Sequence, residues 1–186
     1  AGYGDTLETV ARNVTQCVWT GVCGLSIEDA TGDCDAPLYA LDVAVARMRA
    51  ARTAINASGR DVLLTGRAES FLVGHPSPLE DVLERLTAYA EAGADCLYAP
   101  GLKTPEQVRA VVAAVAPLPV NVLVTDPSWM TVSSLRDLGV RRISVGSALA
   151  RVAWTALIAA ASETATDGTF GALAAATPFA TLNQIF

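Results

Sequence analysis

The sequence has few of the residues that most metal centres and nucleic-acid-binding surfaces require. Its 186 residues include a single histidine, His75, and four cysteines that stand far apart without a Cys-x-x-Cys pair. A zinc site is therefore not expected, because zinc needs clustered cysteine and histidine ligands. The 13 lysines and arginines are scattered, and the formal net charge is -6. This charge pattern argues against nucleic acid as the main partner.

Long apolar runs are also absent. No stretch reaches the roughly 18 to 20 apolar residues of a transmembrane helix, so no membrane partner is expected. The first five residues have neither the basic nor the apolar region of a signal peptide. Cys23 and Cys96 fall within apolar runs and are expected to be buried, reduced thiols. Free thiols are typical of a reducing compartment, so we expect a cytoplasmic protein.

Apolar residues, in contrast, are abundant: they make up 52% of the chain, which is enough for the core of one domain. One unit recurs, in which a helix begins at a capping residue, ends near a glycine and leads into a short apolar strand. Asp5 and Glu8 have the spacing of a capping box at the first helix. The pattern predicts helices over residues 6–20, 38–57, 77–92, 104–115, 131–138 and 149–162, and strands over 22–27, 62–65, 96–99, 120–124 and 142–145.

These alternating elements predict an α/β fold. The strands are continuously apolar, which is typical of a parallel sheet covered on both faces. No strand is followed by a Gly-x-Gly-x-x-Gly or Walker sequence, which weakens the case for a nucleotide-binding open sheet. A complete (β/α)₈ barrel of the TIM type needs about 250 residues, so five units make an incomplete barrel. An open five-stranded sheet is the alternative.

Polar residues close several of the predicted strands, where parallel α/β folds collect their reactive groups. Carboxylates such as Glu28 suit Mg²⁺, which keeps several waters and takes few protein ligands. Arg67 offers a planar fork that matches a carboxylate or phosphonate. We therefore expect a small, multiply anionic substrate held on Mg²⁺. The strand-end residues that carry this expectation are Glu28, Asp29, Arg67, Glu69, Asp126 and Ser147.

Six motifs follow one another along the chain: Gly2-Tyr3-Gly4-Asp5, Ser26-Ile27-Glu28-Asp29, Gly66-Arg67-Ala68-Glu69, Leu97-Tyr98-Ala99-Pro100-Gly101-Leu102, Pro119-Val120-Asn121-Val122-Leu123 and Arg142-Ile143-Ser144-Val145-Gly146-Ser147. In this order they resemble the isocitrate lyase/phosphoenolpyruvate mutase superfamily, in particular its short lyase-like and phosphonomutase-like members. The resemblance covers essentially the whole chain. It implies one partial barrel domain over residues 1–186 that lacks the first three strands, with C-terminal helices over residues 149–186.

The resemblance also implies a function: a Mg²⁺-dependent enzyme that makes or breaks a C–C or P–C bond next to a 2-oxo acid, through an enolate-like intermediate. Members form homo-oligomers, dimers or tetramers, and exchange their last barrel helix, which here covers residues 149–162. The roles carried over are metal binding at Glu28 and Asp29, catalysis at Arg67 and Glu69, and substrate binding at Arg67, Asn121, Gly146 and Ser147.

The sequence also departs from the superfamily. Its lyases carry a Lys-Lys-Cys-Gly-His lid after Ile-Glu-Asp, but residues 30–35 here contain Cys34 without Lys or His. Cleavage of isocitrate or methylisocitrate is therefore not expected. A first alternative is a non-catalytic fragment or degenerate paralogue that acts through packing or oligomerisation, and would itself lack activity. A second is a small-anion sensor. Within either, Glu28 and Asp29 could cap a loop, and Arg67 with Glu69 could form a structural ion pair.

Overall fold

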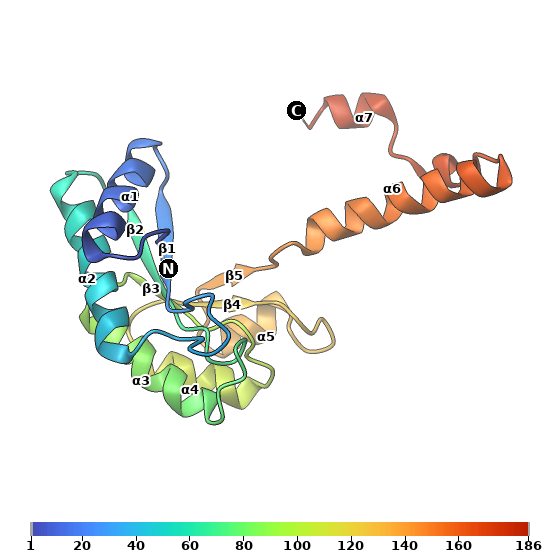
Figure 1. Ribbon diagram of the computed structural model, residues 1–186. Helices are drawn as coiled ribbons and strands as arrows, with labels where there is room; N and C mark the ends of the chain where they lie inside the picture. The colour runs from blue at the N-terminus through green and yellow to red at the C-terminus, as the bar shows by residue number, and fades with distance from the viewer. Residues whose placement is uncertain (1, 186) are drawn as a thin grey trace. The chain divides into compact units, whose positions relative to one another are not determined.

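The computed structural model describes residues 2–185, which contain one parallel five-stranded sheet (Figure 1). The strands lie in the sheet in the order in which they occur in the chain, without reversal. A doubly wound sheet reverses its strand order at a switch point, whereas a (β/α)₈ barrel adds each strand beside the last. The order therefore identifies five successive units of a barrel: β1 Gly24–Glu28, β2 Leu63–Arg67, β3 Cys96–Tyr98, β4 Val120–Leu123 and β5 Arg142–Ser144.

The helices that alternate with these strands lie in an arc along one side of the sheet (Figure 1). The expectation of a sheet covered by helices on both faces is wrong for the described residues. In β2, Leu64 is fully buried while the preceding Leu63 is 55% exposed. The sheet thus has an outer face against helices and an inner face away from them. The helices are α1 Leu7–Trp19, α2 Leu41–Ala57, α3 Pro78–Glu91, α4 Pro105–Val115 and α5 Val132–Asp137.

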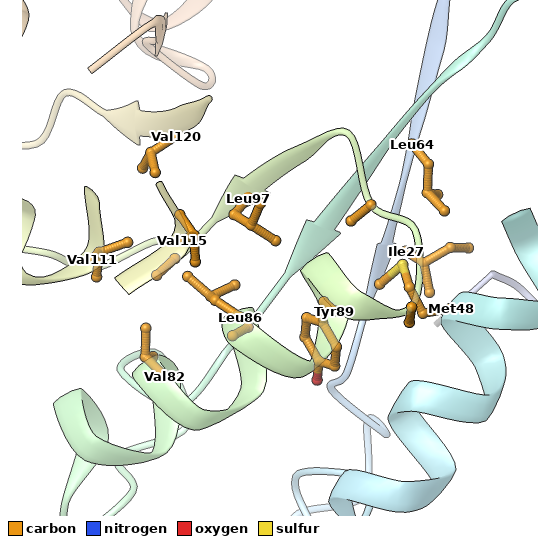
Figure 2. Packing of buried hydrophobic residues seen from close by; sticks show 14 of the residues in the cluster. Ile27, Met48, Leu64, Val82, Leu86, Tyr89, Leu97, Val111, Val115 and Val120 are labelled. Carbon is orange, nitrogen blue, oxygen red and sulfur yellow. The ribbon is translucent and has the colours of Figure 1, made fainter. Parts of the chain in front are cut away.

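The core fills the space between the outer face and the helices. Figure 2 shows Ile27 and Leu64 from the strands close to Met48 of α2 and Tyr89 of α3. Leu97 of β3 lies farther along the same layer and is also fully buried. Each such side chain contributes roughly 1.5 to 3 kcal/mol when it is fully buried. This packing holds the carboxyl ends of the strands in place, and therefore the residues that follow them.

Some local signals in the sequence are confirmed and others are wrong. The helix predicted from residue 104 does begin there, with a capping box between Thr104 and Gln107 at the start of α4. At α1, however, the N-cap is Thr6, whose hydroxyl accepts a hydrogen bond from the Thr9 amide at 3.2 Å, and not Asp5. Either residue can cap a helix, so spacing alone did not decide between them. Cys96 is buried as expected, whereas Cys23 is exposed because β1 begins one residue after it.

The chain divides into two compact units, Ala1–Ser144 and Val145–Phe186. The second contains α6 Ala148–Asp167, the 3₁₀-helix η1 Gly171–Ala175 and α7 Phe179–Asn183. None of the described residues in these three helices is buried. Within residues 2–185, no helix is both long and apolar enough to span a membrane.

Candidate active site at the carboxyl ends of the strands

The strand register places five residues in one row across the sheet. Glu28 pairs with Arg67, Arg67 with Tyr98, Tyr98 with Asn121, and Asn121 with Arg142. Side chains alternate between the faces of a strand, and paired residues share a face. Because Ile27, Leu97 and Val122, which neighbour residues of the row in β1, β3 and β4, lie in the helix-covered core, the row points to the inner face. We call these five residues the inner row.

Arg67 is the centre of the charged part of this row. Its guanidinium forms ion pairs with Glu69 and, at 3.4 Å between Nε and Oε2, with Glu28. It also lies over the ring of Tyr98, 5.1 Å from the ring centre. Two carboxylates and an aromatic ring therefore hold the Arg67 guanidinium in one orientation. In that orientation its N–H groups are suited to bind a single anionic ligand.

Glu69 is a buried carboxyl group beside this cation, with 4% of its surface exposed. Burial raises the pKa of Glu69, and Arg67 opposes that rise through its charge and its hydrogen bond. The nearby carboxylates of Glu28 and Asp29 push the Glu69 pKa further up. A carboxyl group with a raised pKa is suited to holding and releasing a proton, which is a property of general acids and bases.

Asn121 and Tyr98 form the neutral part of the inner row. The Asn121 side-chain amide donates to the Ser144 hydroxyl at 3.0 Å. Its Oδ1 atom is buried and accepts no hydrogen bond from any residue in 2–185. Burial raises the pKa of Tyr98, although Arg67 opposes this, so the phenol stays protonated at neutral pH. The row therefore offers a ligand one buried acceptor and one neutral hydroxyl.

Asp29 turns to the opposite face of the sheet from Glu28. Its Oδ1 accepts from the Glu69 amide at 2.9 Å, and its Oδ2 accepts from the Tyr89 hydroxyl at 2.5 Å and from Arg85 at 3.3 Å. Burial, and then the Asp29 charge, raise the pKa of Tyr89, which keeps that phenol a donor. Metal binding by Asp29 stays a prediction, and these contacts give both of its oxygens other partners.

The remaining predicted residues lie outside this cluster. Asp126 accepts a hydrogen bond from the Ser128 amide at 2.9 Å and so supports its own loop after β4. Gly146 and Ser147 belong to the second compact unit, so their part in substrate binding stays a prediction. Cys34 is exposed in the loop after β1, beside a shallow depression that Val73 also lines.

The metal-binding capacity of the described residues is small. Residues 2–185 hold no group of three or more His, Cys, Asp or Glu side chains that could bind a metal ion together. Glu28 is a half-buried carboxylate on the inner face, which matches the preference of Mg²⁺ for one or two carboxylates and several waters. Glu28 is therefore a suitable ligand for Mg²⁺, whereas Asp29, whose oxygens have other partners, is a poor one.

Tyr98 and Arg142 lie in the inner row, although no motif or strand-end pattern in the sequence predicted a role for either. Tyr98 is the last residue of β3, as Glu28 and Arg67 are of their strands, whereas Arg142 is the first residue of β5. Tyr98 alternates with Leu97, which packs outward into the core, whereas Ile143 beside Arg142 is 37% exposed. For Tyr98 that alternation was the available signal, and for Arg142 only the pairing of β4 with β5 shows that it belongs to the row.

Comparisons with known proteins agree with the fold. The family model described as phosphoenolpyruvate phosphomutase matches residues 1–165. An oxaloacetate decarboxylase of Rhodopseudomonas palustris (strain BisB18) is 33% identical over 183 residues, which cover 95% of this chain and 58% of the decarboxylase. The crystal structure of a lyase/mutase-type protein from Burkholderia cenocepacia J2315 matches with a TM-score of 0.92 and 43% identity, over 98% of this chain and 66% of that one.

Oxaloacetate acetylhydrolase, solved in complex with its product oxalate, matches with a TM-score of 0.83 and 28% identity, over 98% of this chain and 63% of its own. The chain therefore spans about three fifths of the length of these proteins, in agreement with five units of an eight-unit barrel. The family model covers most of the sequence, and the ordered parallel strands have the topology of these relatives. The chain belongs to the phosphoenolpyruvate phosphomutase family, within the PEP mutase/isocitrate lyase superfamily.

Proposed function

We propose that this chain carries part of the active site of a Mg²⁺-dependent lyase or mutase. Its substrate is a small 2-oxo acid or phosphonate, which reacts through an enolate-like intermediate. The observation that carries the proposal is the cluster of Arg67, Glu28 and Glu69 at the carboxyl ends of adjacent strands. The names of two relatives, oxaloacetate decarboxylase and oxaloacetate acetylhydrolase, support a 2-oxo acid as the substrate class.

Arg67 binds the carboxylate or phosphonate of the substrate in this proposal. Its guanidinium can donate two parallel hydrogen bonds to such a group, and its contacts with Glu69 and Tyr98 hold its orientation. A cation held in place before the reaction stabilises negative charge that develops on the substrate in the transition state. The buried Oδ1 of Asn121 would accept a hydrogen bond from the same ligand. Gly146 and Ser147 remain proposed substrate contacts.

Glu69 has two parts in the proposal. While it is ionised it fixes the orientation of Arg67. When a substrate anion binds Arg67, the carboxylate loses part of its stabilising charge, and its raised pKa favours uptake of a proton. Glu69 would then hold that proton beside the bound substrate. This makes Glu69 a candidate acid or base in a site whose lid sequence lacks the histidine and lysines of other lyases.

Mg²⁺ would be held in part by Glu28, directly or through a water. Bound there, it would supply positive charge for the oxygen on which negative charge develops. Since residues 2–185 hold no complete metal-ligand cluster, we propose that this 186-residue chain is inactive alone. Turnover by the isolated chain would contradict that part of the proposal.

The test uses the full-length protein, assayed with oxaloacetate, phosphonopyruvate and 2-methylisocitrate with and without Mg²⁺. We expect Mg²⁺-dependent turnover of one of them. Arg67→Gln should lower kcat/KM at least 100-fold, which is about 2.7 kcal/mol of transition-state stabilisation. Arg136→Gln is the matched control, because that arginine is 72% exposed on α5. Absence of Mg²⁺-dependent turnover with all three compounds would overturn the proposal.

We also propose a homo-oligomer, a dimer or a tetramer, located in the cytoplasm, where its free cysteines stay reduced. The supporting observation is the apolar surface of α6, where Leu149 is 74% exposed and Trp154 is 59% exposed. Exposed apolar surface of this extent is typical of a protein–protein interface. This surface also favours the second candidate function, a non-catalytic chain that acts through oligomerisation.

The oligomer is tested by measuring the molar mass of the full-length protein with light scattering during gel filtration. We expect a multiple of the chain mass, and we expect Leu157→Glu to shift it toward the monomer. Thr155→Glu adds the same charge on an exposed polar position of α6 and serves as the control. A monomeric wild-type protein would contradict the proposed assembly. An oligomer that is inactive on all three substrates would favour the non-catalytic function.

A further inference from the structure

Glu69 and Ser70 follow β2 directly, and each is held by a carboxylate from another part of the chain. The Glu69 amide donates to Asp29 Oδ1 at 2.9 Å, and the Ser70 hydroxyl donates to Asp81 Oδ2 at 2.5 Å. The Glu69 carbonyl in turn accepts from the Leu72 amide at 2.8 Å. The backbone that carries the Glu69 carboxyl group is therefore held on both sides of that residue.

Arg85 of α3 joins these two carboxylates. Its Nε donates to Asp81 Oδ2 at 2.6 Å, and its Nη1 donates to Asp29 Oδ2 at 3.3 Å. The Tyr89 hydroxyl, one turn farther along α3, donates to the same Asp29 oxygen at 2.5 Å. Asp81, Arg85 and Tyr89 are spaced four residues apart, so they lie on one face of the helix. That face holds both of the residues that follow β2.

Gly66 of β2 lets α3 lie this close to the strand. A Cβ atom at Gly66 would lie 3.0 Å from the Cβ of Tyr89 and 3.2 Å from the Cβ of Ala94. The contacts of Arg85 all lie between β1, β2 and α3 on the helix-covered side of the sheet, where Arg85 and Asp29 are buried. A complete barrel adds its strands beside β1 and β5, so it leaves these partners in place.

We propose that Arg85 and Tyr89 are positioning residues for Glu69. They act through Asp29 and Asp81, which keep the segment after β2 in one conformation. The inference rests on the proposed function, in which Glu69 is the acid or base beside the bound substrate. It gives α3 a part in the reaction, although neither of the two positioning residues touches the substrate.

A displaced Glu69 should affect the chemical step more than substrate binding. Arg67, the proposed substrate-binding residue, keeps its contacts with Glu28 and Tyr98 when Glu69 moves. Proton transfer, in contrast, requires the Glu69 carboxyl group at hydrogen-bond distance from the reacting atom. A misplacement of about 1 Å can lower a rate about 100-fold. The positioning role therefore predicts a lower kcat at nearly unchanged KM.

The test compares the steady-state kinetics of variants of the full-length protein, with Mg²⁺ and the substrate that the wild-type protein turns over. Tyr89→Phe removes one donor to Asp29, and Ser70→Ala removes one donor to Asp81. Tyr89→Phe should lower kcat about tenfold and Ser70→Ala about threefold, each with less than about a twofold change in KM. Val111→Ala is the matched control, because it removes buried methyl groups from α4 and lowers stability away from these contacts. Its kcat and KM should equal those of the wild-type protein.

Four outcomes would overturn the inference. An unchanged kcat in both Tyr89→Phe and Ser70→Ala would do so, while a loss of kcat/KM in Arg67→Gln would still support the proposed function. A higher KM at unchanged kcat in both variants would show a role in substrate binding instead. An equal loss of kcat in Val111→Ala and Tyr89→Phe would show that lower stability causes the effect. Absence of turnover by the wild-type protein would overturn the proposed function together with the inference.

Discussion

The two faces of the sheet carry polar groups at the same strand ends, and they use them differently. On the outer face, Asp29 connects β1 to α3 through Arg85 and Tyr89. On the inner face, Glu28 contacts Arg67, and the row continues to Asn121 and Arg142. We call Asp29, Arg85 and Tyr89 the outer group, and its buried charges have hydrogen-bond partners within the protein. The inner row retains a buried acceptor at Asn121 and a cation without a carboxylate among residues 2–185.

This difference separates stability from binding. Arg85, for example, also donates to Asp81 at 2.6 Å and to the Tyr39 carbonyl at 3.0 Å, so its charge is compensated inside the protein. Buried charges require such compensation, since an unpaired charge in a core costs several kcal/mol. Groups that remain available on the inner face can instead be satisfied by a ligand. The outer group should therefore govern unfolding, and the inner row should govern ligand binding.

Removal of Asp29 should have the largest effect on stability. Asp29→Ala leaves Arg85 and Tyr89 buried without their shared acceptor, which should lower the free energy of unfolding by about 3 to 5 kcal/mol. Urea unfolding followed by circular dichroism measures this change. Asp35→Ala, on an exposed carboxylate of the following loop, should leave the midpoint unchanged. A loss under about 1 kcal/mol for Asp29→Ala would contradict the division between the faces.

Tyr89→Phe should have the next largest effect. The ring stays in the core shown in Figure 2, and only the hydroxyl that donates to Asp29 is lost. A hydrogen bond to a charged group contributes about 1.5 to 3 kcal/mol, so the unfolding free energy should fall by about that amount. Combined with Asp29→Ala, the two losses should be less than additive because they remove one interaction. Strict additivity in the same urea measurements would show that the contact is not energetically coupled.

Glu69→Gln should change how stability depends on pH. Burial raises the Glu69 pKa above its ordinary value of 4.5, so the folded state holds a proton that the unfolded state has already released. The contribution of Glu69 to stability is therefore fully present below pH 4.5 and is lost as pH rises through the raised pKa. Unfolding free energies measured across this range should fall less steeply with pH in Glu69→Gln. Identical slopes for both proteins would argue that Glu69 titrates normally.

Glu28→Gln should have the smallest effect on stability. Glu28 and Arg67 form an ion pair between side chains that are 39% and 28% exposed, and partly exposed pairs contribute under about 1 kcal/mol. The same substitution in the full-length protein should weaken the Mg²⁺ dependence of turnover, because Glu28 is the proposed metal carboxylate. Both properties should be measured. A large loss of stability with unchanged Mg²⁺ dependence would show that Glu28 serves stability, as the outer group does, and not metal binding.

The order of helices and strands could be predicted from local sequence, because capping residues, glycine exits and apolar runs act within a few residues. Gly21, for instance, follows the end of α1 with a φ of 88°, a left-handed conformation that glycine adopts readily. The orientation of strand-end residues could not be predicted in the same way. Glu28 and Asp29 are adjacent carboxylates with similar chemistry, and only the packing of Ile27 into the core establishes which of them faces inward.

By itself, the sequence determined the parallel α/β unit, the number of units and the family to which they belong, since each depends on local pattern and motif order. Only the tertiary structure decided which polar residues meet. Arg142 lies 77 positions from Thr65 in the chain, and the two touch because the register and curvature of the sheet bring β5 toward β2. Side-chain contacts of this kind depend on strand pairing over long separations, which no local preference encodes.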